Sequence, residues 1–153
     1  MVDSPHAWAQ HAAVILQRAL ATNDPAVLDH AIDLLRQTIQ AVPENHPDRP
    51  MCLSNLSGGL QTRFARTGKP SDLNEAISAS RAAVDATAAD HPDRPMYLSN
   101  LGVGLQSRFR RIGELADLED GIRASRDAVH ATPADHPNRP MYLSNLSGGL
   151  QTR

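Results

Sequence analysis

The sequence repeats itself at a fixed interval of forty-five residues. A segment that begins His-Pro-Asp-Arg-Pro at His46 returns at His91 and, with asparagine in place of aspartate, at His136. The two complete copies are identical at 29 of 45 positions, and the final eighteen residues match the start of the first copy at all but two. Repetition at this interval is typical of stacked supersecondary units that cannot bury their apolar faces alone. The pattern therefore predicts a solenoid.

The copies divide the chain into repeats of one array. Complete units are expected at residues 46–90 and 91–135, and residues 136–153 carry only the first helix of a further unit. Residues 1–45 follow the same frame more loosely, and we expect them to form a divergent N-terminal capping repeat, since terminal repeats are usually atypical. The prediction is a single array over residues 1–153.

The amino-acid composition favours a helical fold and argues against a nucleic-acid partner. Aromatic residues make up only 3% of a chain that is 41% hydrophobic, so small and aliphatic side chains must fill the core. Such side chains suit closely packed helices, and we expect an all-α solenoid of about seven helices. The net charge is −2, and the fifteen basic residues are spread over every copy. We therefore expect no nucleic-acid partner, because no cationic face is indicated.

The single cysteine and the hydropathy pattern indicate the cellular compartment of the protein. Cys52 has no second cysteine to pair with, and its counterparts Tyr97 and Tyr142 indicate a tolerant helical position with an inert thiol. The apolar patch near the N-terminus is too short for a signal peptide, and no stretch approaches membrane-spanning length. We expect a cytoplasmic protein without a membrane partner.

Helix signals in residues 1–45 predict a helical hairpin. Asp3 or Ser4 can cap a first helix, and Asp24 can cap a second helix that ends before Pro43. The residues expected to face the core, by their helical spacing, are Trp8, Ile15, Ala19 and Leu20 in the first helix and Leu28, Ile32, Leu35 and Ile39 in the second.

The two complete copies repeat this hairpin. In the first of them, Asp48 is expected to cap the first helix, Gly68 to end it, and Ser71 to cap its partner. Gly121 replaces Ala76 in the second copy, which predicts a close backbone approach, because glycine within a helix costs up to ~1 kcal/mol relative to alanine. The residues expected to face inward are Leu53, Leu56, Leu60, Phe64, Leu73, Ile77 and Val84, and in the second copy Leu98, Leu101, Leu105, Phe109, Leu118, Ile122 and Val129.

The last copy stops after its first helix. No partner helix follows to cover Leu143, Leu146 and Leu150, so we expect an exposed apolar face near the C-terminus. Either the natural protein continues beyond Arg153, or another chain covers this helix. A homo-oligomer formed through the C-terminal helix is therefore an alternative function.

Parts of a known repeat signature recur in the chain. The matching residues are Leu98, Leu101, Gly102, Leu105, Gly121, Ser125 and Pro133 in the third copy, and Trp8, Ala12, Ile15, Ala31, Leu35 and Pro43 in the first. They resemble the tetratricopeptide repeat (TPR), in a form eleven residues longer than the usual 34 that is similar to the repeats of kinesin light chains. The resemblance covers the whole chain. It implies a right-handed superhelix of antiparallel helical hairpins that binds a protein or an extended peptide in a concave groove.

The resemblance also suggests which residues would line such a groove. They are Asn55, Asn100, Asn145, Met51, Met96, Met141, Gln61 and Gln106. An asparagine amide can donate to and accept from a peptide backbone at the same time, and methionine offers an adaptable apolar contact. The alternative is that each asparagine braces a neighbouring hairpin or a helix end.

Arginines also recur at the repeat interval. One set is Arg18, Arg63, Arg108 and Arg153, and the other is Arg36, Arg81 and Arg126. We expect them to pair with Asp72, Asp117, Asp90 or Asp135, or with carbonyl groups at helix ends. Anchoring of an acidic partner is the alternative.

No pattern indicates catalysis or a cofactor. His46, His91 and His136 stand one whole unit apart, so no two of them can share a metal ion. The sequence has neither a phosphate-binding glycine loop nor a nucleophile with a credible base. We expect no catalytic residue, no metal and no cofactor. The function that remains is protein or peptide binding by a regulatory or scaffold segment of a larger protein.

Overall fold

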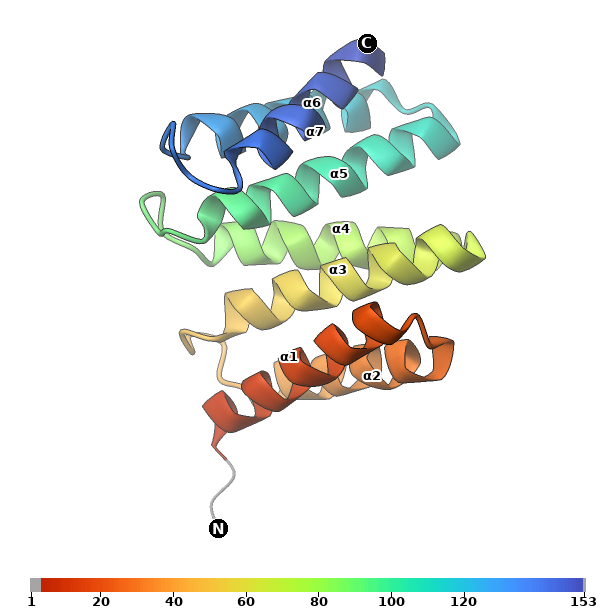
Figure 1. Cartoon of the computed structure of the whole chain (residues 1–153), viewed down its shortest axis with the longest axis vertical. Helices are drawn as coiled ribbons and strands as arrows, with labels where there is room; N and C mark the ends of the chain where they lie inside the picture. The colour runs from red at the N-terminus through yellow and green to blue at the C-terminus, as the bar shows by residue number, and fades with distance from the viewer. Residues whose placement is uncertain (1–3, 153) are drawn as a thin grey trace. The chain divides into compact units, whose positions relative to one another are not determined.

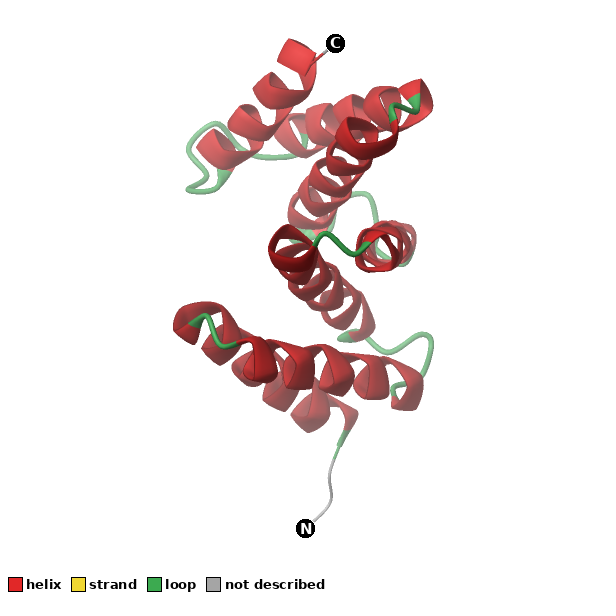
Figure 2. Cartoon of the chain, turned by 90° about the vertical axis from the view of Figure 1, so that its right-hand side faces the viewer, coloured by secondary structure: helices red, strands yellow, loops and turns green. Residues whose placement is uncertain are grey.

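The chain is built from α-helices that pair in sequence order. The computed structural model describes residues 4–152, in which seven helices and no strand are found (Figure 1). The helices are α1 (Pro5–Thr22), α2 (Pro25–Ala41), α3 (Arg49–Thr67), α4 (Pro70–Asp85), α5 (Arg94–Ile112), α6 (Leu115–His130) and α7 (Arg139–Thr152). Only loops join them, as Figure 2 shows. The all-α prediction is confirmed.

The helices form two compact units, residues 1–86 and residues 87–153. In the first unit α1 packs on α2, α3 packs on α4, and α3 also contacts both helices of the preceding hairpin. In the second unit α5 packs on α6, and α7 lies against both of them. The single array over residues 1–153 stays a prediction.

Short-range signals set most of the helix ends. Ser4 caps α1, where its hydroxyl accepts a hydrogen bond from the Ala7 N–H at 3.2 Å. Asp24 caps α2 by accepting from the Ala26 N–H at 2.9 Å. Gly68 ends α3 at φ 71°, a left-handed conformation that costs glycine little. Asp3 lies outside the described residues.

Two predicted caps differ from the structure. Ser71 was expected to cap α4, but the helix begins one residue earlier, at Pro70, and Lys69 is the capping residue. Proline prefers the first helical position because its fixed φ suits the helix and it has no N–H to satisfy. Asp48 does precede α3, although its side chain makes no capping hydrogen bond.

The core follows the predicted apolar stripes except in α1. The inward residues of α3 and α4 are buried except Phe64, which is half-buried, and Leu60 and Leu73 have 0% and 2% of their surface exposed. In α1 the predicted residue Ala19 is buried but Leu20 is 47% exposed, and the helix also buries Ala9, Ala12 and Leu16. This face is mostly alanine because neighbouring helices approach closely there, and small side chains allow such an approach.

Small residues line the seam between the helices of each hairpin. Between α3 and α4, the hydroxyls of Ser57 and Ser80 are hydrogen bonded at 2.5 Å. Between α5 and α6, a Cβ added to Gly102 would lie 3.0 Å from the carbonyl oxygen of Gly121, and it would collide with the hydroxyl of Ser125. The close approach predicted at Gly121 is confirmed.

Because of this seam, two glycine-to-alanine substitutions should change the free energy of unfolding in opposite directions. Gly102→Ala should lower the free energy of unfolding by about 1–2 kcal/mol, because overpacking outweighs the gain in helix propensity. Gly58→Ala in α3 should raise it by up to about 1 kcal/mol, because an added Cβ there meets no atom within 4 Å. Urea denaturation of both variants and the wild type measures the two effects. Equal shifts of the same sign would contradict the close approach of α5 and α6.

Candidate interaction surfaces

In the first unit, equivalent positions on α1 and α3 carry different side chains. His6 and Gln10 of α1 occupy the repeat positions that Met51 and Asn55 occupy in α3. The Nδ1 atom of His6 lies 2.5 Å from a carboxylate oxygen of Asp48, and this contact joins the start of α1 to the residue before α3. The Nε2 atoms of His6 and Gln10 are 3.1 Å apart. The α1 side of this surface is therefore polar and bonded within the chain.

The α3 side of the same surface is different. Asn55 is half-buried, and its side-chain amide makes no hydrogen bond with any residue in the range 4–152. Met51, one turn earlier, is 39% exposed. Gly58, one turn later, leaves open space where a side chain would stand. A side-chain amide without a hydrogen bond can donate to and accept from the backbone of another polypeptide, and here it lies between an apolar side chain and an open position.

In the second unit the asparagine at this position braces two helices. The amide Nδ2 of Asn145 on α7 donates to the hydroxyl of Ser99 on α5 at 2.8 Å. Asn100 on α5 is half-buried. Bracing is therefore observed for Asn145, whereas the amide of Asn55 has no such bond within residues 4–152.

The two predicted glutamines bond within the chain. Gln106 is only 5% exposed, and its Nε2 donates to the hydroxyl of Ser125 on α6 at 3.2 Å and to the carbonyl of Asn145 on α7 at 3.3 Å. Gln61 in α3 donates to Ser57 at 3.1 Å. Gln106 therefore holds α5, α6 and α7 together, and we do not include either glutamine in the proposed binding surface.

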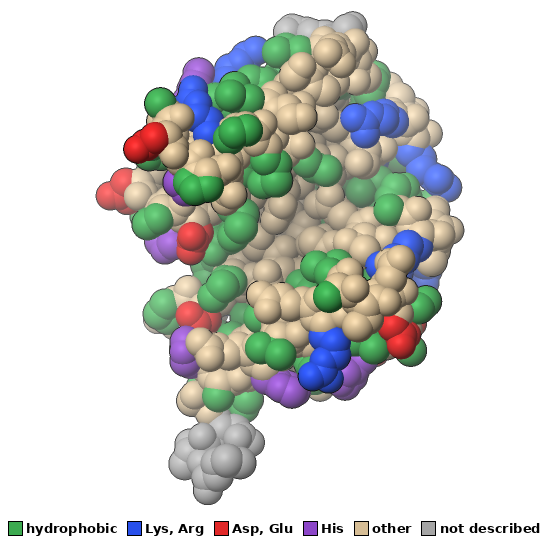
Figure 3. Space-filling model, viewed as in Figure 1, with side chains coloured by type: hydrophobic (Ala, Val, Ile, Leu, Met, Phe, Trp, Pro, Cys, Tyr) green, Lys and Arg blue, Asp and Glu red, His purple; other side chains and the backbone are tan. Residues whose placement is uncertain are grey.

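The predicted methionines are largely open to solvent. Met141 is 51% exposed and Met96 is half-buried. In the space-filling view, uncharged and apolar side chains are visible among the charged ones (Figure 3). Uncharged and apolar groups are thus available for contact with another molecule.

Two arginines of the first set form ion pairs between the two helices of their own hairpins. Arg63 donates from Nε and Nη2 to both carboxylate oxygens of Asp72, each at 2.8 Å, and Arg108 makes the same pair with Asp117 at 2.8 and 2.9 Å. Arg63 also donates to Asp29 of α2 at 3.0 Å, which ties the two hairpins of the first unit together. These contacts agree with the predicted pairing to Asp72 and Asp117. Arg153 lies outside the described residues.

The electrostatic effect of this pairing is clear at Asp72. Its side chain is 3% exposed, and the bidentate hydrogen bond from Arg63 lowers the pKa of the carboxyl group below its ordinary value. The same contact raises the pKa of Arg63. A buried charge of this kind is stable only with its partner in place.

The remaining predicted arginines are arranged differently. In the second set, Arg36 of α2 donates to both carboxylate oxygens of Glu75 on α4, at 2.9 and 2.6 Å. Arg81 and Arg126 are exposed. Arg18 is exposed as well, and it forms no ion pair within residues 4–152. The position of an arginine in the forty-five-residue repeat therefore does not by itself determine its partner.

A third set of arginines was missed by the sequence analysis. Each belongs to a His-Pro-Asp/Asn-Arg-Pro segment and bonds to a backbone carbonyl seven to ten residues earlier. Arg49 donates to the carbonyl of Ile39 at 2.6 Å, Arg94 to that of Thr87 at 2.6 Å, and Arg139 to that of Thr132 at 2.7 Å. The sequence analysis did expect arginines to bind carbonyl groups at helix ends, but it expected this of the first two sets and not of Arg49, Arg94 and Arg139.

The histidine of each segment shapes the same turn. The Nδ1 atoms of His46, His91 and His136 each accept the N–H of the residue two positions later, at 3.1 Å. Among the described residues, no group of histidine, cysteine and acidic side chains is arranged to hold a metal ion. These histidines therefore have a structural role in the links between helices.

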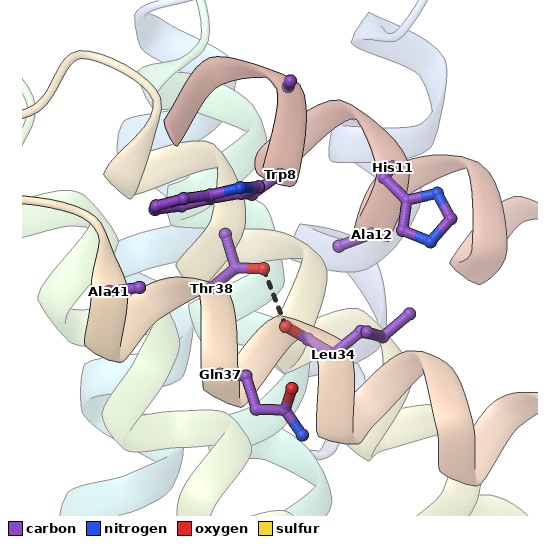
Figure 4. A pocket seen from close by; sticks show the side chains of 8 residues that line it. Trp8, His11, Ala12, Leu34, Gln37, Thr38 and Ala41 are labelled. Carbon is purple, nitrogen blue, oxygen red and sulfur yellow. Dashed lines mark hydrogen bonds between the residues drawn. The ribbon is translucent and has the colours of Figure 1, made fainter. Parts of the chain in front are cut away.

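Each unit contains a surface hollow. In the first unit a hollow of about 520 Å³ opens between α1 and α2, where Trp8 lies over Thr38 and Ala41, beside His11 (Figure 4). In the second unit a hollow of about 410 Å³ lies among the links before α5 and α7, with Tyr142 and the two histidines at its wall. Neither contains an unpaired buried polar atom that would mark a ligand site.

Cys52 is buried in the core, and the helices are not apolar enough to span a membrane within the described residues. Cys52 is 1% exposed, and burial raises the pKa of its thiol to about 11, which agrees with an inert cysteine. Within residues 4–152, none of the helices combines the length and apolar character needed to cross a bilayer.

Comparison with known proteins supports the architecture. No protein-family model and no curated protein matches the sequence. A crystal structure of nearly identical TPR-like repeats from a Podosopora anserina kinesin light chain superimposes with a TM-score of 0.75, and 98% of this chain and 68% of that chain are covered at 15% identity. The fold is a TPR-like helical repeat. A single-substitution variant of the same protein gives a TM-score of 0.73 at 14% identity over 97% and 68% of the two chains.

The likeness agrees with the resemblance seen in the sequence. At 15% identity it establishes the fold of the chain and does not assign a partner.

The Arg63–Asp72 pair should make stability depend on pH. Because the folded pKa of Asp72 is depressed, its contribution is present above the ordinary carboxyl pKa of about 4 and is lost as pH falls through the lower folded pKa. Thermal melts from pH 7 to pH 2 should show a smaller acid loss in Asp72→Asn than in the wild type.

Asp33→Asn is the matched control, because Asp33 is 62% exposed and pairs within its own helix. It should keep the acid dependence of the wild type. An unchanged acid loss in Asp72→Asn would contradict the assignment.

Proposed function

We propose that this chain is a protein–protein interaction module that binds an extended peptide or a partner domain, as a regulatory or scaffold segment. The class follows from the TPR-like fold, which covers 98% of the chain. The observation that carries the residue-level proposal is Asn55, whose amide makes no hydrogen bond within residues 4–152 and lies one turn from the exposed Met51. In the second unit, Met96, Asn100, Met141 and Asn145 occupy the same repeat positions.

The proposed contact combines backbone recognition with an apolar anchor. Asn55 would donate to and accept from the same peptide unit, and this geometry does not depend on the peptide's side chains. Met51 would adapt to whichever apolar side chain follows. The open position at Gly58 leaves room for the peptide to pass along α3.

A binding measurement separates this role from a structural one. Peptides selected from a random library on the wild-type chain are titrated by calorimetry against Asn55→Ala and Met51→Asp. Each substitution should weaken binding about tenfold, as expected for one lost hydrogen-bonded or apolar contact. The melting temperature should change little, because Asn55 has no partner to lose and Met51 is 39% exposed.

Two variants serve as controls. Val14→Asp replaces a residue of α1 that is 54% exposed and should leave binding unchanged. Asn145→Ala removes the bond to Ser99 and should lower the melting temperature. Full affinity in both Asn55→Ala and Met51→Asp would remove this surface from the proposal.

Self-assembly is a second candidate function. It is favoured by the apolar face of α7, on which Leu143 and Leu150 are 44% and 42% exposed. Apolar side chains exposed together on one helix favour association. Light scattering over a concentration series should then show a mass that rises with concentration and that Leu150→Asp abolishes. A constant monomer mass would exclude this candidate.

A further inference from the structure

The first helices of successive hairpins contact each other in both units, and the two contacts share one residue register. In the first unit α3 meets α1 at Gly59, where an added Cβ would lie 3.3 Å from the side chain of Leu16. In the second unit α7 meets α5 at Gly149, where an added Cβ would lie 2.9 Å from the side chain of Gln106. Gly149 and Gln106 stand two whole repeats after Gly59 and Leu16. The two contacts can therefore be compared position by position.

The two contacts differ in the hydrogen bonding of the asparagine on the later helix. In the second unit the Nδ2 atom of Asn145 donates to the hydroxyl of Ser99 on α5 at 2.8 Å. In the first unit the same position on α1 holds Ala9, which is 5% exposed and has no polar side-chain atom. Asn55 is the equivalent of Asn145, and it therefore lacks the hydroxyl that its counterpart bonds.

The first unit joins the same two helices by a different polar contact. The Nδ1 atom of His6 on α1 lies 2.5 Å from a carboxylate oxygen of Asp48, the residue before α3. The equivalent positions in the second unit hold Met96 and Asn138, which cannot form an ion pair. The first unit thus connects its helices without the amide of Asn55, whereas the second unit uses an asparagine amide for that purpose.

We propose that the residue at position 9 determines which unit binds the peptide. Alanine at this position leaves the amide of Asn55 for an incoming backbone, whereas serine at the equivalent position 99 occupies the amide of Asn145. This inference rests on the proposed function, which places Asn55 in the binding surface. Ala9 is itself buried, so it acts through Asn55 as a positioning residue.

The free amide also specifies the form of the partner segment. A carboxamide matches one backbone N–H and one backbone C=O at the same time. In an α-helix or inside a sheet these groups are already hydrogen bonded to their own chain. The first unit therefore binds an extended segment with unpaired backbone groups, and the exposed Met51 contacts an apolar side chain of that segment.

The substitution Ala9→Ser tests the inference in the full chain. Serine fits at this position, because Ser99 is only 3% exposed at the equivalent position of α5. The new hydroxyl should accept the amide of Asn55 and weaken binding of the peptide selected on the wild-type chain about tenfold, as Asn55→Ala does. Adding Asn55→Ala to Ala9→Ser should then cause little further loss in a calorimetric titration. A second tenfold loss in the double variant would contradict the inference.

Amide exchange measures the hydrogen bond without any peptide. In the wild type, the side-chain amide protons of Asn55 should exchange with water faster than the bonded proton of Asn145, as followed by NMR. Ala9→Ser should slow the exchange at Asn55, and Ser99→Ala should speed it at Asn145. Unchanged exchange at Asn55 in Ala9→Ser would overturn the inference whatever the affinities are.

Two control variants separate the hydrogen bond from other effects of the substitution. Ala7→Ser makes the same chemical change at an exposed residue of α1 and should leave affinity and exchange as in the wild type. Ala9→Cys adds a side chain close in size to serine, but sulfur is a weak hydrogen-bond acceptor, so affinity should stay near that of the wild type. A loss in Ala9→Cys equal to that in Ala9→Ser would mean that size is responsible. Thermal melts establish that each variant is folded.

The affinities also distinguish this inference from the proposed function. Wild-type affinity in Ala9→Ser, together with weakened binding in Asn55→Ala, would overturn the inference and leave the binding surface in place. Wild-type affinity in both variants would remove Asn55 from the surface, and the inference with it.

Discussion

The packing of two helices along a seam of small residues is the interaction on which each hairpin depends. Between α3 and α4 the seam contains Ser57 and Ser80, and between α5 and α6 it contains Gly102 and Gly121. Small side chains let the helices approach until the flanking leucines and isoleucines are excluded from water. Burial of each such side chain stabilises the fold by about 1.5–3 kcal/mol. An exposed helix with the same sequence lacks that contribution.

Polar contacts fix the turns that lead into α3, α5 and α7. The arginine after each His-Pro-Asp/Asn turn binds a backbone carbonyl seven to ten residues earlier, and the histidine of that turn accepts a backbone N–H. Arg63 pairs with aspartates on two different helices. These bonds satisfy groups that helix ends leave unpaired. The arginine and the histidine of this repeated turn are therefore used for architecture.

The sequence predicted the repeat frame, the helices and most inward residues, because proline, glycine and apolar spacing act over a few residues. In α1 it was right for Ala19 and wrong for Leu20, which is exposed, because the approach of neighbouring helices decides which side of a helix is covered. It also treated Asn55 and Asn145 as equivalent. Asn145 meets Ser99 on a neighbouring helix, whereas Asn55 has no such partner within residues 4–152. Identical residues acquire different roles from their tertiary surroundings.

Native-state hydrogen exchange of α3 and α7 tests most directly whether the partner helix stabilises these helices. The two segments differ at only two positions, so intrinsic helix propensity is closely matched, and α3 has a covering helix that α7 lacks among the described residues. The amides of Leu56 and Leu60 should exchange far more slowly than those of Leu146 and Leu150. Equal protection of the two helices would contradict the account, because it would mean that α7 needs no partner across its exposed face.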